Sequence, residues 1–278
     1  VGIYALIRFF TLVFVIDMGY LSFLLPALAA LTMITGVLGA AAQNEFRRIL
    51  SFHIISQVGY MVLGLALQTR LALAGTVFYL VHHIIVKANL FLVSGVVRQL
   101  QGTFELARLG GIYRSNGWIA ALFFIPAFSL AGFPPLSGFW AKMILIRACL
   151  ETHQYWLALV AAAVGLLTVY SMTKIWNQAF WKPKPEAAEN DEAPAGAARP
   201  VEAWMVAPVI AMAALTVLIG LWRVRLDAIL NLINALPLAR ERGISVSRSR
   251  VGDVTGYRGV LEVDPRKADA IPSTKGAL

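Results

Sequence analysis

Charge is scarce in this sequence. Of its 278 residues, 14% are Asp, Glu, Lys or Arg, whereas 59% are hydrophobic, and the mean hydropathy is +0.71. A soluble domain of this length would expose far more charge. The composition therefore predicts an all-α membrane protein, because a helix satisfies its own backbone hydrogen bonds inside lipid.

Cysteine is nearly absent as well. Cys149 is alone, so the chain cannot build a disulfide framework or a cysteine metal cluster by itself, and we expect no metal and no other cofactor. The chain starts at Val1 within an apolar run and shows no signal-peptide pattern. We expect it to be the C-terminal part of a longer membrane protein.

Long apolar runs predict about seven transmembrane helices, each able or nearly able to cross about 30 Å of hydrocarbon. The fifth run is too long for one simple crossing, and residues that interrupt helices lie inside it: Gly132, Pro134, Pro135 and Gly138. We expect two half-helices there, joined by irregular backbone that is buried in protein or lines water. The seven runs are 2–16, 21–42, 49–67, 72–97, 118–146, 155–181 and 203–222.

The loops indicate an orientation. Eight Lys or Arg residues fall in alternate loops, which the positive-inside rule places in the cytoplasm: Arg47, Arg48, Arg98, Arg108, Arg114, Lys182, Lys184 and Arg199. We therefore divide the chain into a transmembrane domain, 1–223, with a flexible cytoplasmic linker at 182–202, and a tail, 224–278.

The tail conflicts with this orientation. Residues 223–278 carry ten Lys or Arg against six Asp or Glu, yet the count of crossings places them outside, so either the tail is anomalous or the count is wrong by one. Its composition favours disorder or a short surface helix near 226–236. We do not interpret its basic charge as nucleic-acid binding.

Two lysines stand at membrane depth. Lys87 lies in the fourth run, one helical turn after His83, and Thr76 and Ser94 extend the same face. A buried ammonium is costly and usually marks an ion or proton pathway. The alternative is a structural pair with a buried carboxylate, but the predicted spans contain no acidic residue. We interpret Lys87 and His83 as proton-transfer residues.

The second lysine, Lys142, follows the interrupted part of the fifth run. Because Pro134 and Pro135 lack backbone donors, they leave carbonyls free to hold water beside the lysine. Packing would explain the prolines but not the cation. We predict that Lys142 also transfers protons.

Four further polar residues are candidates for a supporting water path. His82 points about 100° away from His83 on the helix. A role in ordinary helix packing is equally compatible with this position. His53 and Gln57 share a face with Tyr60 in the third run, a pattern that equally suits hydrogen bonds between helices. Lys174 lies near the end of the sixth run, where its side chain could instead extend to the membrane interface.

Four stretches stand out in order along roughly 1–182: Val1-Gly-Ile-Tyr-Ala-Leu-Ile-Arg-Phe-Phe, Asn44-Glu-Phe-Arg-Arg-Ile-Leu-Ser-Phe-His, Phe78-Tyr-Leu-Val-His-His-Ile-Ile-Val-Lys-Ala-Asn-Leu-Phe-Leu and Ala131-Gly-Phe-Pro-Pro-Leu-Ser-Gly-Phe-Trp-Ala-Lys. Together they resemble the proton-translocating antiporter-like subunits shared by complex I and the Mrp-type Na⁺/H⁺ antiporters. The third and fourth stretches, with Ser171-Met-Thr-Lys-Ile-Trp, are most similar to the Mrp D subunits.

The resemblance implies the second of two inverted five-helix repeats, with flanking helices. It matches Lys87 to the central proton-carrying lysine of the family, His83 to the histidine one turn earlier, and Lys142 to the lysine beside the second broken helix. It further implies a multi-pass subunit of the bacterial inner membrane that works with other membrane subunits, exchanging protons for Na⁺ or another monovalent cation.

Two other classes of protein stay open. One is a proton-pumping membrane subunit of a complex I-like NADH:quinone oxidoreductase or related hydrogenase, which would have the same fold and a redox driving module. The other is a haem-binding membrane carrier that uses His53, His82 and His83, which would require histidine pairs facing each other across two helices.

Overall fold

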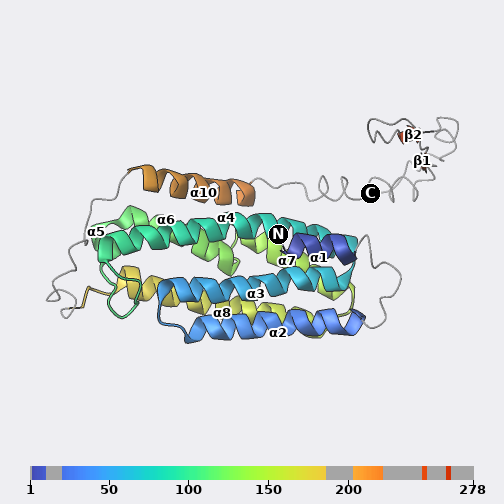
Figure 1. Cartoon of the computed structure of the whole chain (residues 1–278), viewed down its shortest axis with the longest axis horizontal. Helices are drawn as coiled ribbons and strands as arrows, with labels where there is room; N and C mark the ends of the chain where they lie inside the picture. The colour runs from blue at the N-terminus through green and yellow to red at the C-terminus, as the bar shows by residue number, and fades with distance from the viewer. Residues whose placement is uncertain (1, 11–20, 186–202, 222–245, 249–260, 264–278) are drawn as a thin grey trace, which may run out of the picture. The chain divides into compact units, whose positions relative to one another are not determined.

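The computed structural model describes residues 2–10, 21–185, 203–221, 246–248 and 261–263. Residues 1–223 form one unit, a bundle of helices that run side by side (Figure 1). Its helices are α1 (Gly2–Arg8), α2 (Leu21–Ala42), α3 (Phe46–Leu67), α4 (Arg70–Gln101), α5 (Ile112–Ser115), α6 (Gly117–Ala131), α7 (Ser137–Glu151), α8 (Tyr155–Ile175), the π-helical turn η2 (Trp176–Trp181) that continues α8, and α10 (Ala203–Leu221).

The predicted membrane spans match this architecture. Five of the described helical segments are long and apolar enough to cross a membrane, namely α2, α3, α4, α8 with η2, and most of α10. The interrupted fifth run forms two half-helices, α6 and α7, as its Gly and Pro residues predict. The all-α membrane fold is therefore confirmed. Of the first predicted run, residues 11–16 lie outside the described part of the chain.

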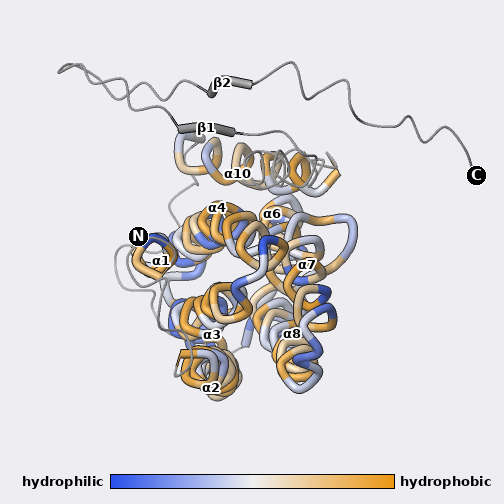
Figure 2. Tube along the Cα trace, turned by 90° about the vertical axis from the view of Figure 1, so that its right-hand side faces the viewer, coloured by the Kyte–Doolittle hydropathy of each residue, from blue (hydrophilic) through white to orange (hydrophobic). Residues whose placement is uncertain are grey.

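The packing order places α4 and the two half-helices at the centre. The α2 helix packs on α3 and α8, α3 on α4, and α4 on α6, α7 and α10, while α8 also contacts α6 and α7. Figure 2 shows this arrangement along the bundle, with α2 and α8 on the side away from α10. The α4 helix, at 32 residues, is about 48 Å long. It therefore contributes side chains at every depth of the bundle.

Large apolar side chains cover the outside of the bundle as well as its core. Phe23, Leu159 and Leu166 are each more than 70% exposed. Such surfaces are rare on soluble monomers but match a helix bundle surrounded by lipid. Buried polar side chains, in contrast, lie between the helices.

The loops predicted to be cytoplasmic meet at one end of the bundle. The Phe46 amide donates to the Phe104 carbonyl (2.9 Å), and the Gly111 amide donates to the Lys182 carbonyl (2.7 Å). The Lys182 ammonium donates to the carbonyl oxygens of Leu106 and Ala107, and burial lowers its pKa. The alternate loops are therefore on one side, as the charge pattern requires.

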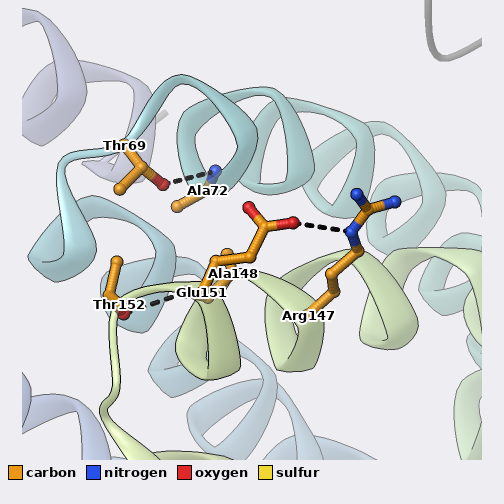
Figure 3. A network of polar contacts seen from close by, with 6 residues as sticks. All are labelled: Thr69, Ala72, Arg147, Ala148, Glu151 and Thr152. Atoms are coloured by element: carbon orange, nitrogen blue, oxygen red, sulfur yellow. Dashed lines mark hydrogen bonds and ion pairs between the residues drawn. The ribbon is translucent and has the colours of Figure 1, made fainter.

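Polar contacts between neighbouring residues lie at the start of α4 and at the end of α7 (Figure 3). The Thr69 hydroxyl accepts a hydrogen bond from the Ala72 amide (3.1 Å) at the start of α4, an N-cap that satisfies one free backbone donor. At the end of α7, Arg147 pairs with Glu151 (2.7 Å). Both of these side chains are half exposed or more, so the pair contributes little to stability.

Residues 224–278 form a second unit. Its described part consists of two three-residue strands, β1 (Val246–Arg248) and β2 (Leu261–Val263), which pair antiparallel with Val246 opposite Val263. The all-α prediction did not include this small sheet. The surface helix expected near 226–236 and most of the linker expected at 182–202 lie outside the described residues.

Candidate functional site

Lys87 is buried in the middle of α4, with 6% of its surface exposed. Its ammonium donates a hydrogen bond to the backbone carbonyl of Leu50 on α3 (3.0 Å). Ion pairs between described residues lie elsewhere, as between Arg48 and Glu45 at the start of α3. Within the described part of the chain, Lys87 therefore has a neutral acceptor and no carboxylate, so burial disfavours its charged form.

A group of buried polar atoms without hydrogen-bond partners lies beside Lys87. Both ring nitrogens of His53, which is fully buried, lack a partner within the described part of the chain, as do Nε2 of Gln57 and Nε2 of His83. The charges of Lys87 and Lys142 both act on the His53 ring, so His53 lies within electrostatic range of both lysines. Buried polar atoms are nearly always paired, and unpaired ones indicate ordered water or a functional role.

Lys142 lies on α7 directly beside the break between the two half-helices. Its ammonium donates to the carbonyl of Ala131, the last residue of α6 (2.9 Å). The α6 helix ends at Gly132, whose φ of 98° favours glycine, and the Pro134–Pro135 peptide bond that follows is cis. A carbonyl left free by the break thus accepts a hydrogen bond from the lysine itself, whereas the proline pair was expected to leave carbonyls that hold water.

His82 of α4 forms a hydrogen bond with a residue at the break between α6 and α7. Its Nδ1 lies 2.8 Å from the hydroxyl of Ser137, the first residue of α7, and that hydroxyl lies 3.2 Å from the hydroxyl of Ser129 in the last turn of α6. The Gly138 amide donates to the Ser129 hydroxyl (3.3 Å). This cluster is almost fully buried and joins α4 to both half-helices.

Gly138 allows the half-helices to approach this closely. A Cβ at this position would lie 1.7 Å from the Ser129 carbonyl oxygen and 2.9 Å from Cε1 of His82. Contacts under 3.0 Å to backbone require the backbone to shift. Gly138 was expected to interrupt the helix, but the structure places it in the first turn of α7, where its role is to allow close packing.

Two tyrosines connect the polar groups of α3 and α4. The Tyr79 hydroxyl donates to Oε1 of Gln57, and its ring stacks on Tyr60 with centroids 5.4 Å apart. The Tyr79 ring also meets His82 edge to face at 5.8 Å. The two tyrosines therefore lie between the predicted residues of α3 and those at the break.

The predicted site residues thus fall into two groups. At the break itself, Gly132 is partly buried and Pro134 and Pro135 are exposed. Those that the structure places in one buried region around α3, α4 and the break are Lys87, His83, His53, Gln57, His82, Lys142 and Gly138. The others bond to local acceptors. The Thr76 hydroxyl donates to the Ala72 carbonyl (2.9 Å) and the Ser94 hydroxyl to the Phe91 carbonyl (2.7 Å).

Lys174 ends in a separate cluster. Its ammonium donates to the carbonyls of Ala41 (3.0 Å) and Gln43 (2.7 Å) and to Oδ1 of Asn44 (2.9 Å). These acceptors lie in the last turn of α2 and directly after it, where a cation complements the helix dipole. The arrangement supports a capping role for this lysine.

The sequence analysis did not single out Tyr79, Ser129 or Ser137. Each lies on a run with abundant apolar residues, where a single hydroxyl is common. The sequence did contain one indication for Tyr79: it lies three residues before His82 and therefore on the same helix face. The contact between His82 and Ser137 joins residues 55 positions apart, which no local pattern reveals.

The fold and the site together define a multi-pass helical membrane protein that holds protonatable side chains between its helices and beside a broken helix. Residues 1–168 match the family model described as NADH:quinone oxidoreductase/Mrp antiporter, TM. The chain belongs to this family.

Relatives and solved structures agree with the family. The chain is 49% identical over 220 residues to the D subunit of the Na⁺/H⁺ antiporter of Alkalihalophilus pseudofirmus, covering 79% of this chain and 43% of that protein. It is 36% identical over 186 residues to the equally named protein of Bacillus subtilis, covering 67% of this chain and 38% of that protein. The chain thus spans less than half of each.

Two solved structures have the same fold. The Mrp complex from Dietzia has a chain that is 33% identical with a TM-score of 0.73, covering 86% of this chain and 52% of that one. Respiratory complex I from Thermus thermophilus has a chain with a TM-score of 0.73 at 22% identity, covering 86% of this chain and 48% of that one. The second likeness concerns the fold alone.

Proposed function

We propose that this chain is part of the D subunit of a multisubunit monovalent cation/proton antiporter, in which it carries protons between Lys87 and Lys142. Its relatives among the D subunits of Na⁺/H⁺ antiporters support this assignment, at 49% and 36% identity. The bilayer would be the bacterial inner membrane and the partners other membrane subunits of the complex. Protons and Na⁺, or another monovalent cation, would be the ions exchanged.

One observation carries the proton-transfer role. Lys87 and Lys142 are buried, and each donates a hydrogen bond to a neutral backbone carbonyl, at Leu50 and Ala131 respectively. An ammonium held by a carbonyl pays a desolvation cost that a carboxylate partner would offset. Because this cost is not offset, the neutral amine lies close in free energy to the ammonium, and the side chain can release and regain a proton.

His53 and His83 supply the connection between the lysines. His53 is within electrostatic range of both ammonium groups, and its two ring nitrogens have no partner among the described residues. An imidazole has one donor and one acceptor nitrogen, so it can pass a proton between two waters without a net change. Water beside His53, Gln57 and His83 would complete their hydrogen bonds and link Lys87 to Lys142.

Electrostatic coupling would give the transfer a direction. Two positive charges buried in the same helix bundle repel each other, so protonation of Lys87 would disfavour a proton on Lys142. A charge change elsewhere in the full-length protein would reset the pair. The chain would thus act as a translocating part of an antiporter, a role that requires no chemical transformation of a substrate.

The test is ion exchange in vesicles that contain the complete antiporter, with Na⁺, K⁺ and Li⁺ supplied separately. We expect Lys87→Ala to abolish proton-coupled exchange. Lys87→Arg should also fail, because arginine keeps its charge and does not release its proton. Arg147→Gln, at an exposed ion pair, is the matched control and should exchange normally. Near-normal exchange in Lys87→Arg would show that the charge is structural and overturn the relay.

A further inference from the structure

Among the residues that the structure describes, Lys142 has no carboxylate partner. Its ammonium has one hydrogen-bond acceptor among the described residues, the carbonyl of Ala131. The groove that it lines with the break, α7 and α8 has a volume of about 330 Å³, and Lys142 is the one charged residue among the groove's lining residues. Something other than a carboxylate must therefore stabilise the ammonium form.

The aromatic ring of Tyr60 faces this ammonium. Nζ of Lys142 lies 5.3 Å from the ring centroid, inside the range of about 6 Å over which a ring face attracts a cation. Tyr60 is fully buried, so water does not screen the attraction. Such an interaction is stronger when desolvated than at an exposed site.

The Tyr60 ring is held in place by contacts from two other helices. Its hydroxyl donates a hydrogen bond to the Ala161 carbonyl on α8, and the Tyr79 ring of α4 stacks on it at an interplanar angle of 13°. At Gly165 on α8, an added Cβ would lie 3.7 Å from the Tyr60 hydroxyl and 3.9 Å from Nζ of Lys142. The α8 backbone therefore lies against both groups, and the glycine leaves room for them.

The other titratable groups around Lys142 do not replace this partner. His53 of α3 and His82 of α4 are the imidazoles on which its charge acts, and a protonated imidazole would repel the ammonium. From α6 it meets the Ala131 carbonyl, and from α8 the lining of the groove is apolar. The ring of Tyr60 and one carbonyl dipole remain as the favourable contacts.

We propose that Tyr60 is a positioning residue for Lys142, whose ring face stabilises the ammonium and holds it at the break between α6 and α7. The inference rests on the proposed role of Lys142 in proton-coupled exchange. A carboxylate in this place would bind the ammonium strongly and hinder proton release. A ring face attracts the charged form more weakly, so both the ammonium and the neutral amine of Lys142 can be populated.

The pH profile of exchange in vesicles containing the complete antiporter tests this role. Tyr60→Phe keeps the ring face and loses the hydroxyl, and should retain the wild-type profile. Tyr60→Leu removes the ring face and should move the profile by about one unit toward lower pH, because the ammonium loses its partner. Tyr170→Leu, at an exposed tyrosine of α8, is the matched control and should show no shift.

A series of fluorinated phenylalanines at position 60 separates the ring's electrostatics from its packing. Fluorination weakens the negative face of the ring with little change in size, so the profile should move stepwise with the number of fluorines. If the Tyr60→Leu variant fails to assemble, the fluorinated series still tests whether the ring face acts on Lys142. Identical profiles for phenylalanine and its fluorinated forms would overturn the inference. If Lys142→Ala instead exchanges normally, the proposed role of the lysine fails whatever Tyr60 does.

Discussion

The ammonium of Lys142 donates a hydrogen bond to the carbonyl of Ala131 across the break between α6 and α7. The two residues are 11 positions apart and belong to different half-helices. The break thus creates the acceptor that the lysine uses, since the residues after Ala131 leave the helical path at Gly132. Two predictions concern this contact and its surroundings.

We expect Lys142→Ala to leave the complex assembled and to reduce exchange strongly. Removing a cation from membrane depth saves about 2.5 to 3.5 kcal/mol on insertion scales, so membrane insertion should survive or improve. The measurements are the amount of assembled complex and the exchange rate in vesicles. A rate equal to that of the wild type would exclude Lys142 from the pathway.

Replacing Gly138 by alanine should destabilise the protein by about 3 kcal/mol or more, because the new Cβ would lie 1.7 Å from a backbone oxygen. Thermal unfolding of the purified complex measures the change. Gly117→Ala is the control, since nothing lies within 4 Å of a Cβ there. Equal unfolding temperatures for the two variants would contradict the close packing at the break.

His53→Leu should separate function from stability. The imidazole nitrogens have no partner among the described residues, so an apolar replacement should leave stability unchanged or raise it. Exchange should fall, because the connection between Lys87 and Lys142 is lost. Ser51→Leu, at an exposed position of the same helix, serves as the control. A stable His53→Leu variant that exchanges normally would exclude His53 from the path.

Lys174→Met should lower stability and spare transport. The variant loses three hydrogen bonds to the end of α2. A hydrogen bond to a charged group contributes about 1.5 to 3 kcal/mol to stability. We expect a loss of about 2 kcal/mol after methionine repacks, with exchange per assembled complex retained. Loss of exchange at full assembly would instead place Lys174 in the proton path.

The broken helix was predictable from sequence because its causes are local. Single prolines are tolerated inside α2 and α6, but a glycine and two adjacent prolines within four residues, Gly132, Pro134 and Pro135, favour the end of a helix, and they lie in a run too long for one crossing. The long spans were predictable for a similar reason, since 18 or more apolar residues in sequence carry their own signal. Because the predicted spans contain no acidic residue, the sequence also predicted that Lys87 and Lys142 have no carboxylate partner within the spans, and none contacts them among the described residues.

The tertiary structure decided which polar groups meet. Sequence periodicity places His82 away from His83 but does not say what His82 faces, and the structure brings it to Ser137 at the break. Lys174 was a candidate for the supporting water path, whereas its ammonium donates hydrogen bonds to carbonyls at the end of α2.

The physical reason is the range of the interactions involved. Helix formation and breaking depend on neighbours within about four residues, and a charge within a long apolar run is visible in the sequence without knowledge of its partners. The Tyr60 ring and the Lys142 ammonium are 82 positions apart in the sequence, and they meet because α3, α7 and α8 pack together. The sequence alone therefore determined the membrane fold, the break and the presence of lysines at membrane depth, and only packing determined the partners of these lysines.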